Sequence, residues 1–455
     1  MNDLTTGPVT KHLLKTTSFM LVTMVFQTLY FLVDLYWVGK LGTDAVAAVS
    51  VAGNLTFIVL ALTQMLGVGT TTVISHATGR KDHGGALLAF NQAQVLAVVT
   101  GVAFLLVGML LRLPYSNRMA ADAISARLAA EYLLWFIPAM ALQFALVSMG
   151  SALRGIGNFK PGMIVGTVTV IINMILAPFL IFGWVTGRAF GVAGAAISSL
   201  VAIIIGIVWY AMYFTPRDAY LRFIVADWKP KLEIWKRMLA IGLPAGFEFS
   251  MMAIYLFLVY SITRPFGAAA QAGFGIGGRV VQAGFMPVVA LGFSVAPVAG
   301  QNFGAMLPDR VKHTFRDASL MASGLMFAFA ILCHIVPHAL VRIFSNDPAV
   351  IEVGDEYLRI VSYTFIPSGL IFVASSMFQA MGNTVPSLIA SAVRLLLIAI
   401  PLIFLTKMNG FQLNWIWYLS ATAVFIQMVL SLSLLRMQFA RRLQFGPARA
   451  ESVPA

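Results

Sequence analysis

The feature that most constrains this chain is a series of long apolar runs that recurs over nearly its whole length. A helix needs about 20 apolar residues to cross a lipid bilayer. Runs of this length predict about twelve spanning helices, with approximate limits at 14–38, 45–75, 86–112, 125–153, 160–183, 191–214, 238–262, 270–300, 314–342, 352–380, 385–406 and 415–436. The sequence therefore predicts an all-α integral membrane protein.

The composition excludes the main alternatives. Of the 455 residues, 60% are hydrophobic and 10% are charged, whereas about 25% of a soluble domain is charged. The 30 basic and 17 acidic residues are too few to coat a water-facing surface. A soluble enzyme, a nucleic-acid binder and a disordered scaffold are excluded. The single cysteine, Cys333, leaves no intramolecular disulfide and no cysteine-based metal site.

The chain carries an internal repeat with a separation of 225 residues. Glu131-Tyr-Leu recurs as Glu356-Tyr-Leu, and Gly157-Asn recurs as Gly382-Asn. The repeat predicts two six-helix halves that enter the bilayer in the same sense. We expect an N-terminal lobe at 1–214, a cytoplasmic linker at 215–237, and a C-terminal lobe with a short basic tail at 238–455.

The basic residues predict the orientation in the membrane. With the N-terminus inside, the inner segments hold about 19 Lys and Arg and the outer loops about nine, which places both termini in the cytoplasm. The net charge of +13 is then explained by the basic residues of the cytoplasmic segments, which we expect to contact anionic lipid headgroups. We expect the lipid bilayer and small organic molecules as partners, no nucleic acid, and a monomer.

No enzyme machinery is recognisable. Gly273-Phe-Gly-Ile-Gly-Gly278 fits a dinucleotide-binding pattern, but it begins an apolar span and follows no strand, so these glycines are better explained by close helix packing. There is no Walker A loop, no H-E-x-x-H, and no pair of Cys or His at metal spacing. We expect no enzyme activity, no metal and no cofactor.

Polar residues within the first span are the sharpest functional signal. Gln27, Tyr30 and Asp34 follow one another at i, i+3 and i+7, so they share one helical face. A carboxylate in hydrocarbon must pair, take up a proton or line a wet cavity, and removal from water favours the protonated form of a carboxyl group. The alternative is an acid near the helix end, which reaches the outer interface beside Trp37.

For the other polar residues within the spans, the indication of a functional role is weaker. Glu248 lies four residues after Pro244, where it either has a functional role or reaches the cytoplasmic interface. Arg279 and Arg394 lie in apolar surroundings and need an acceptor inside the bundle, and Glu248 is one candidate. Asn173 could line a cavity or make an ordinary interhelical hydrogen bond.

Several segments together resemble the multidrug and toxic compound extrusion (MATE) family. They are Asp34-Leu-Tyr-Trp-Val-Gly39 in the first span, Ser75-His-Ala-Thr-Gly79 and Pro297-Val-Ala-Gly-Gln-Asn302 at the two second-helix ends, Gly242-Leu-Pro244 in the seventh span and Asn173 to Gly183 in the fifth. The resemblance extends from about residue 14 to 436. It implies a twelve-helix fold of two lobes around a central cleft, and export of amphipathic, often cationic compounds against a proton or sodium gradient.

The resemblance also implies roles for individual residues. Asp34 matches the coupling acid of the family's first helix, and Gln27, Tyr30 and Asn173 match its neighbours in the branch similar to DinF. Two positions depart from that branch: Ala177 stands where an acid is usual, and Ala195 where a threonine is usual. In the other lobe, Ser368 stands where the NorM branch has an acid, and Glu248 matches that branch's seventh-helix glutamate only loosely.

With so few ligands near Asp34, the expected coupling ion is a proton rather than sodium. We expect a multi-pass protein of the cytoplasmic membrane that exports organic compounds by alternating access, with Asp34 as the coupling carboxylate and Gln27, Tyr30, Asn173, Glu248 and Arg279 lining the substrate or cation site. Two alternatives stay open: a flippase for lipid-linked or polysaccharide precursors, and a passive channel.

Overall fold

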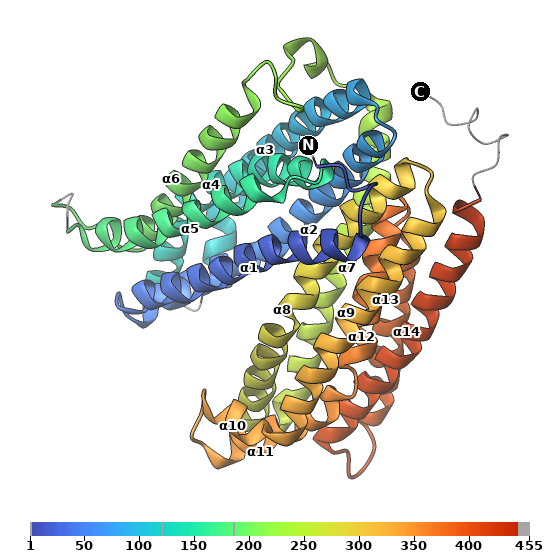
Figure 1. Ribbon diagram of the computed structural model, residues 1–455. Helices are drawn as coiled ribbons and strands as arrows, with labels where there is room; N and C mark the ends of the chain where they lie inside the picture. Colours follow the sequence, from blue (N-terminus) through green and yellow to red (C-terminus); the bar gives the residue numbers. More distant parts are fainter. Residues whose placement is uncertain (1, 121, 185–186, 445–455) are drawn as a thin grey trace. The chain divides into compact units, whose positions relative to one another are not determined.

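The structure is a computed structural model that describes residues 2–120, 122–184 and 187–444. These residues form long α-helices joined by short connections, and no strand occurs among them (Figure 1). Eleven of the helices in these ranges are long and apolar enough to cross a membrane, or twelve when one bent pair is counted as a single span. The predicted all-helical membrane fold is confirmed.

The helices follow one another along the chain with no strand between them in the described ranges. Those of the first half are α1 (Val9–Gly39), α2 (Thr43–Gly79), α3 (His83–Met119), α4 (Ala123–Gly155), α5 (Phe159–Phe182) and α6 (Gly191–Phe214). Those of the second half are α7 (Leu232–Thr263), α8 (Ala268–Gly304), α9 (Pro308–Ile335), α10 (Pro337–Arg342), α11 (Pro348–Ser362), α12 (Phe365–Ala380), α13 (Val385–Leu405) and α14 (Leu413–Arg442). Two short 3-10 helices, η1 (Val225–Trp228) and η2 (Arg264–Phe266), lie in the connections.

The backbone confirms the repeat of 225 residues. Lys81 and Met306, with φ of 60° and 58°, are the non-glycine residues with positive φ in the described chain, and they are 225 positions apart. Gly157 and Gly382, with φ of 74° and 69°, end α4 and α12 at the same separation. Left-handed residues are uncommon outside glycine. The two halves therefore share the geometry of their turns as well as the order of their helices.

One span of the second half is broken, whereas its counterpart in the first half is continuous. The predicted span at 352–380 is the pair α11 and α12, which are bent by 58° at Tyr363–Thr364. Pro367 lies in the first turn of α12 and has no N–H to continue the hydrogen bonds of α11. The equivalent position in the uninterrupted α4 is Leu142. The predicted span at 314–342 likewise consists of α9 followed by the short α10.

The chain divides into two compact units whose boundaries fall inside helices. Unit 1 contains the residues up to Asp3 and Ser18–Gly246, and unit 2 contains Leu4–Thr17 and everything from Phe247 onward. The first turns of α1 thus belong to unit 2, and the first half of α7 belongs to unit 1. This division differs from the expected lobes, whose boundary lies in the polar segment 215–237.

Glycines allow the backbones of α7 and α2 to come into direct contact within unit 1. A Cβ atom on Gly242 would collide with the carbonyl oxygen of Met65, and one on Gly246 would lie 2.7 Å from the carbonyl oxygen of Ala61. On the facing helix, a Cβ atom on Gly69 would lie 2.5 Å from the carbonyl oxygen of Met238. Small residues four apart allow such close packing of membrane helices.

The segment between α6 and α7 is fastened to α3 by two amide side chains. Oδ1 of Asn91 accepts hydrogen bonds from the backbone N–H of Ile224 (2.9 Å) and the indole N–H of Trp228 (3.0 Å). Nε2 of Gln92 donates to the carbonyl oxygens of Asp227 (2.6 Å) and Lys229 (2.7 Å). The polar linker predicted from sequence is therefore an ordered part of unit 1.

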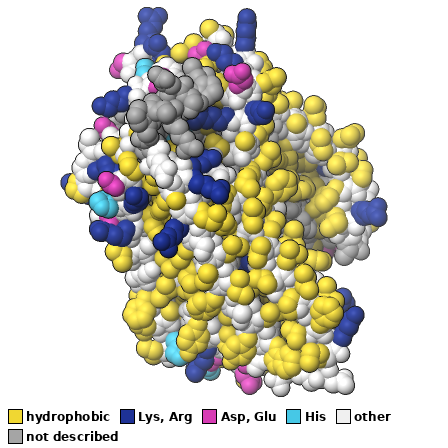
Figure 2. All heavy atoms as spheres, turned by 90° about the vertical axis from the view of Figure 1, so that its right-hand side faces the viewer, with side chains coloured by type: hydrophobic (Ala, Val, Ile, Leu, Met, Phe, Trp, Pro, Cys, Tyr) yellow, Lys and Arg dark blue, Asp and Glu magenta, His cyan; other side chains and the backbone are white. Residues whose placement is uncertain are grey.

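The surface has the character of a membrane protein. On the face drawn in Figure 2, hydrophobic side chains cover a wide, continuous area, and most Lys and Arg side chains gather toward its upper part. Large apolar side chains on the helices are strongly exposed, for example Leu110 at 78% and Phe257 at 75%. Soluble proteins rarely expose apolar patches of this extent.

Candidate functional site

Asp34 lies in α1, five residues before the helix ends at Gly39. Its Oδ1 atom is buried and has no hydrogen-bond partner among the described residues. Six residues further on, the ammonium group of Lys40 lies over the rings of Tyr36 (4.7 Å) and Trp37 (5.0 Å), an arrangement suited to a membrane–water interface. Asp34 therefore lies within two turns of the end of its helix, as the predicted span 14–38 indicated, and it carries a buried, unpaired oxygen.

A polar network from three helices lies in the same unit. The hydroxyl of Tyr30, on α1, is 3.0 Å from Oγ of Ser199 on α6. Nδ2 of Asn173, on α5, donates to Ser199 Oγ (3.0 Å) and to Ser198 Oγ (3.4 Å). Asn173 is only 3% exposed, and its Oδ1 has no partner in the described chain. The predicted residues Tyr30 and Asn173 are thus brought together through serines that the sequence did not single out.

The other predicted positions in this unit contribute no charge and no hydrogen bond around Asp34. Gln27 is exposed and makes no hydrogen bond among the described residues. Ala177 and Ala195, each 1% exposed, are packed in the apolar core of this unit. Tyr132 on α4 is also buried and lies within electrostatic range of the Asp34 carboxylate. The described ranges contain no cluster of His, Cys, Asp and Glu able to hold a metal ion.

Glu248 occupies a second acidic site, in unit 2. Its carboxylate accepts hydrogen bonds from Oγ of Ser387 (2.8 Å), of Ser375 (3.1 Å) and of Ser391 (3.3 Å). Ser375 lies on α12, whereas Ser387 and Ser391 are one turn apart on α13. The hydroxyl of Ser387 is also 2.9 Å from that of Ser375. We call Glu248 and these three residues the serine cage.

The serine cage favours one of the two interpretations left open for Glu248. A carboxylate that reaches toward the interface would be hydrated, whereas this one is surrounded by hydroxyl donors from two other helices. The sequence could not reveal the cage, because isolated serines are common in membrane helices and their usual role is an ordinary hydrogen bond. Only the packing of α7 against α12 and α13 distinguishes these three.

We expect Ser387→Ala to weaken the protein through the Glu248 carboxylate. A hydrogen bond to a charged group contributes about 1.5–3 kcal/mol, so the melting temperature in detergent should fall. In a Glu248→Gln background the same substitution should cost much less, because the buried charge is gone. An equal loss in both backgrounds would show that Ser387 acts only through packing.

The arginines within the spans do not pair with Glu248. Arg279 is exposed and has no hydrogen bond or ion pair among the described residues. The guanidinium of Arg394 lies 5.1 Å from the ring centre of Tyr255, and it too has no carboxylate partner in the described part of the chain. The suggested pairing with Glu248 is therefore wrong, because the serine cage already occupies that carboxylate.

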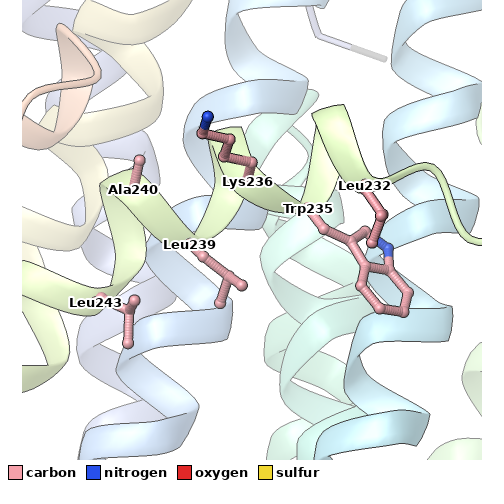
Figure 3. Close-up of a pocket in the computed structure, with 6 residues that line it drawn as sticks. All are labelled: Leu232, Trp235, Lys236, Leu239, Ala240 and Leu243. Carbon is pink, nitrogen blue, oxygen red and sulfur yellow. The ribbon is translucent and has the colours of Figure 1, made fainter.

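A shallow cavity of about 490 Å³ lies along one stretch of α7, and it is not a polar site. Its lining consists of Leu232, Trp235, Lys236, Leu239, Ala240 and Leu243, as drawn in Figure 3. All six come from one helix, and Lys236 is the single charged side chain among them. Apolar stems with one Trp and one Lys near a helix end are typical of a surface that faces lipid.

Comparison with known sequences supports the repeat and identifies the family. The sequence model of the MatE family matches residues 20–179 and 244–405, once in each half. The probable multidrug resistance protein YoeA of Bacillus subtilis is 25% identical over 418 residues, which is 90% of each chain. The multidrug export protein MepA of Staphylococcus aureus is 27% identical over 387 residues, and a FAD transporter of Shewanella oneidensis is 25% identical over 376, covering 83% and 82% of each chain respectively.

Solved structures share the fold over nearly the whole length. A multidrug resistance MATE family transporter of the MOP superfamily, in an outward-facing conformation, superposes with a TM-score of 0.88 at 24% identity and covers 98% of both chains. A MOP superfamily transporter from Pyrococcus furiosus gives 0.89 at 23% identity, also over 98% of both chains. Together with the matched halves, these similarities establish that the chain is a multi-pass membrane transporter that belongs to the MatE family.

Proposed function

We propose that this transporter exports amphipathic, often cationic organic compounds in exchange for protons, with Asp34 as the coupling carboxylate. The observation that supports this most is the buried Oδ1 of Asp34, which has no hydrogen-bond partner among the described residues. Such a carboxylate can gain or lose a proton without breaking a hydrogen bond. Glu248, in contrast, is engaged by three hydroxyl groups.

The place of Asp34 near the end of α1 suits proton exchange with the outside. In the proposed cycle, deprotonated Asp34 favours the inward-open state that loads a cationic substrate. A proton from outside then neutralises Asp34 and discharges the substrate. The nearby network of Tyr30, Ser199 and Asn173 gives α1 polar partners on α5 and α6 that can rearrange when the charge changes.

Sodium coupling is the second candidate, and the serine cage favours it. A sodium ion prefers several oxygen ligands, and the cage offers two carboxylate oxygens with three hydroxyls around them. The surroundings of Asp34 offer fewer, since Ala177 and Ala195 contribute none. The two ions thus favour different residues, so the coupling ion identifies the working site.

The experiment is dye transport into proteoliposomes with a proton gradient alone, a sodium gradient alone, or neither. We expect uphill dye movement with the proton gradient only. Uphill movement with sodium alone would assign coupling to Glu248 and reject Asp34. Transport at full rate without a gradient would indicate a passive channel, and specific binding of a pyrophosphate-linked lipid in place of the dyes would indicate a flippase.

The names of the relatives support the substrate class. YoeA is described as a probable multidrug resistance protein and MepA as a multidrug export protein, which favours organic compounds of varied structure. The FAD transporter shows that a relative at the same level of identity carries a phosphate-containing aromatic molecule.

We also propose that both chain ends and the segment 215–237 face the cytoplasm, because basic residues concentrate there. The single native cysteine, Cys333, is fully buried, so introduced cysteines can be labelled without background. We expect a membrane-impermeant thiol reagent on intact cells to label Asn346→Cys, in the predicted outer loop before α11, and to spare Asp218→Cys in the linker. Labelling in the reverse pattern would overturn the orientation.

A further inference from the structure

Arg394 lies close to the middle of a membrane-spanning helix. It follows the first residue of α13 by nine positions and precedes the last by eleven. At 1.5 Å per residue, these intervals correspond to about 14 Å and about 16 Å of helix. An arginine at that depth is costly and needs a partner or water.

The side chain of Arg394 is on the face of α13 that packs against protein. Ser387, Ile398 and Leu402, which share this face at helical spacing, are buried at 4% exposure or less. The opposite face carries exposed side chains such as Leu396 (55%) and Ile400 (51%). Arg394 therefore does not point toward lipid, and the interior of unit 2 must provide for its charge.

What unit 2 provides is an aromatic ring and no acceptor. The guanidinium lies over Tyr255 of α7 at 5.1 Å, and the hydroxyl of Tyr255 is held 2.9 Å from Oγ of Ser420 on α14. This is a cation–π contact with the face of the tyrosine ring, and it supplies no hydrogen-bond acceptor to the guanidinium. Its five N–H groups point outward around the edge, and none of them has an acceptor in the described ranges.

Glu248 does not serve as the missing acceptor. It precedes Tyr255 by seven residues on α7, which places the two about 10 Å apart along the helix. Its own oxygens accept hydrogen bonds from the serine cage. Arg394 and Glu248, both in unit 2, therefore form no ion pair with each other among the described residues.

We propose that Arg394 binds an anionic group of the transported molecule, a carboxylate or a phosphate, so that the substrates include zwitterionic and anionic aromatic compounds. A guanidinium presents two parallel N–H groups, which suits a carboxylate or phosphate oxygen pair. A zwitterion would place its anion at Arg394 and its cation toward Glu248. The inference rests on the proposed function, since it names the substrate class of the same transporter.

A lipid headgroup is a poor candidate for this anion. Headgroups lie at the two ends of a spanning helix, and Arg394 is about 14 Å from the nearer end of α13. To reach it, a phosphate would have to enter the hydrocarbon region. A soluble molecule that enters the protein interior can bring its carboxylate to that depth inside a polar environment.

The test measures binding of two matched dyes to the purified full-length protein in detergent, without any gradient. One is a rhodamine with a free carboxylate, and the other is its methyl ester. We expect tighter binding of the acid by the wild type. Arg394→Gln should weaken binding of the acid about tenfold to a hundredfold, in line with loss of a charged hydrogen bond, and should leave the ester nearly unchanged.

Three further proteins make the result specific. Arg394→Lys keeps the positive charge but lacks the two parallel N–H donors of arginine, so its affinity for the acid should fall by an intermediate amount. It replaces Arg394→Gln in the test if that variant does not fold. Lys407→Gln removes a positive charge from an exposed residue just beyond the end of α13 and should change the binding of neither dye. Asp34→Asn should keep the preference for the acid, because binding to Arg394 requires no proton coupling.

Several outcomes would overturn the inference. They are equal binding of acid and ester by the wild type, equal weakening of both dyes by Arg394→Gln, and displacement of the acid by anionic phospholipid. Loss of gradient-driven transport in the wild type, with the preference for the acid retained, would reject proton-coupled export alone and leave the anion site standing. The two proposals therefore fail separately.

Discussion

Asp34→Asn is expected to abolish uphill export of cationic dyes while leaving the protein folded and inserted. Asparagine fills nearly the same volume as aspartate, but it cannot gain or lose a proton, so the step that couples discharge of the substrate to the gradient disappears. Dye efflux from membrane vesicles under an imposed pH gradient, at matched expression, measures the effect. The rate should fall to that of vesicles without a gradient.

Two variants show whether the effect is specific to Asp34. Asp44→Asn makes the same chemical change at an exposed acid in the first turn of α2, and its efflux should match the wild type. Asp34→Glu keeps a titratable group and should retain partial activity. Efflux by Asp34→Asn at the wild-type rate would transfer coupling to Glu248 or another group.

Gly242→Ala is expected to reduce the yield of folded protein sharply. The added methyl group would collide with the carbonyl oxygen of Met65 on α2, and backbone cannot move aside as a flexible side chain does. Overpacking of this kind costs about 1–3 kcal/mol and occasionally more. Fluorescence-detected size exclusion and a thermal melt in detergent would show a smaller monodisperse peak and a lower melting temperature.

The control is Gly324→Ala in α9, where no heavy atom lies within 4 Å of the added Cβ. Alanine is a better helix former than glycine by about 1 kcal/mol, so this variant should be as stable as the wild type or more so. If both substitutions behaved alike, the close approach of α7 to α2 would not limit stability.

The features that could be predicted from sequence are those set by local pattern. Apolar runs fixed the membrane class and most helix positions, and recurring residues such as Gly157 and Gly382 gave the offset that the backbone angles confirm. Turn glycines are informative because few other residues adopt positive φ. Pro367 is the sequence feature that corresponds to the break at Tyr363–Thr364. It did not allow the break to be predicted, because a proline often bends an apolar helix without interrupting the helix.

The features that escaped prediction depend on which helices meet. Nothing in the local sequence distinguishes Ser375, Ser387 and Ser391 from the other serines of the spans, yet they surround Glu248. Tyr255 likewise became the partner of Arg394 only through the packing of α7 near α13. Long-range contacts of this kind decide the electrostatics of a site, and one sequence carries no direct record of them.

The role of Asp34 is tested most directly by the proton movement that accompanies transport. Proteoliposomes with a pH-sensitive dye trapped inside would report proton flux when substrate is added across an existing pH gradient. The wild type should dissipate the gradient in a substrate-dependent way, and Asp34→Asn should not, although it still binds substrate. Substrate-dependent proton flux of equal rate in both proteins would contradict Asp34 as the coupling carboxylate.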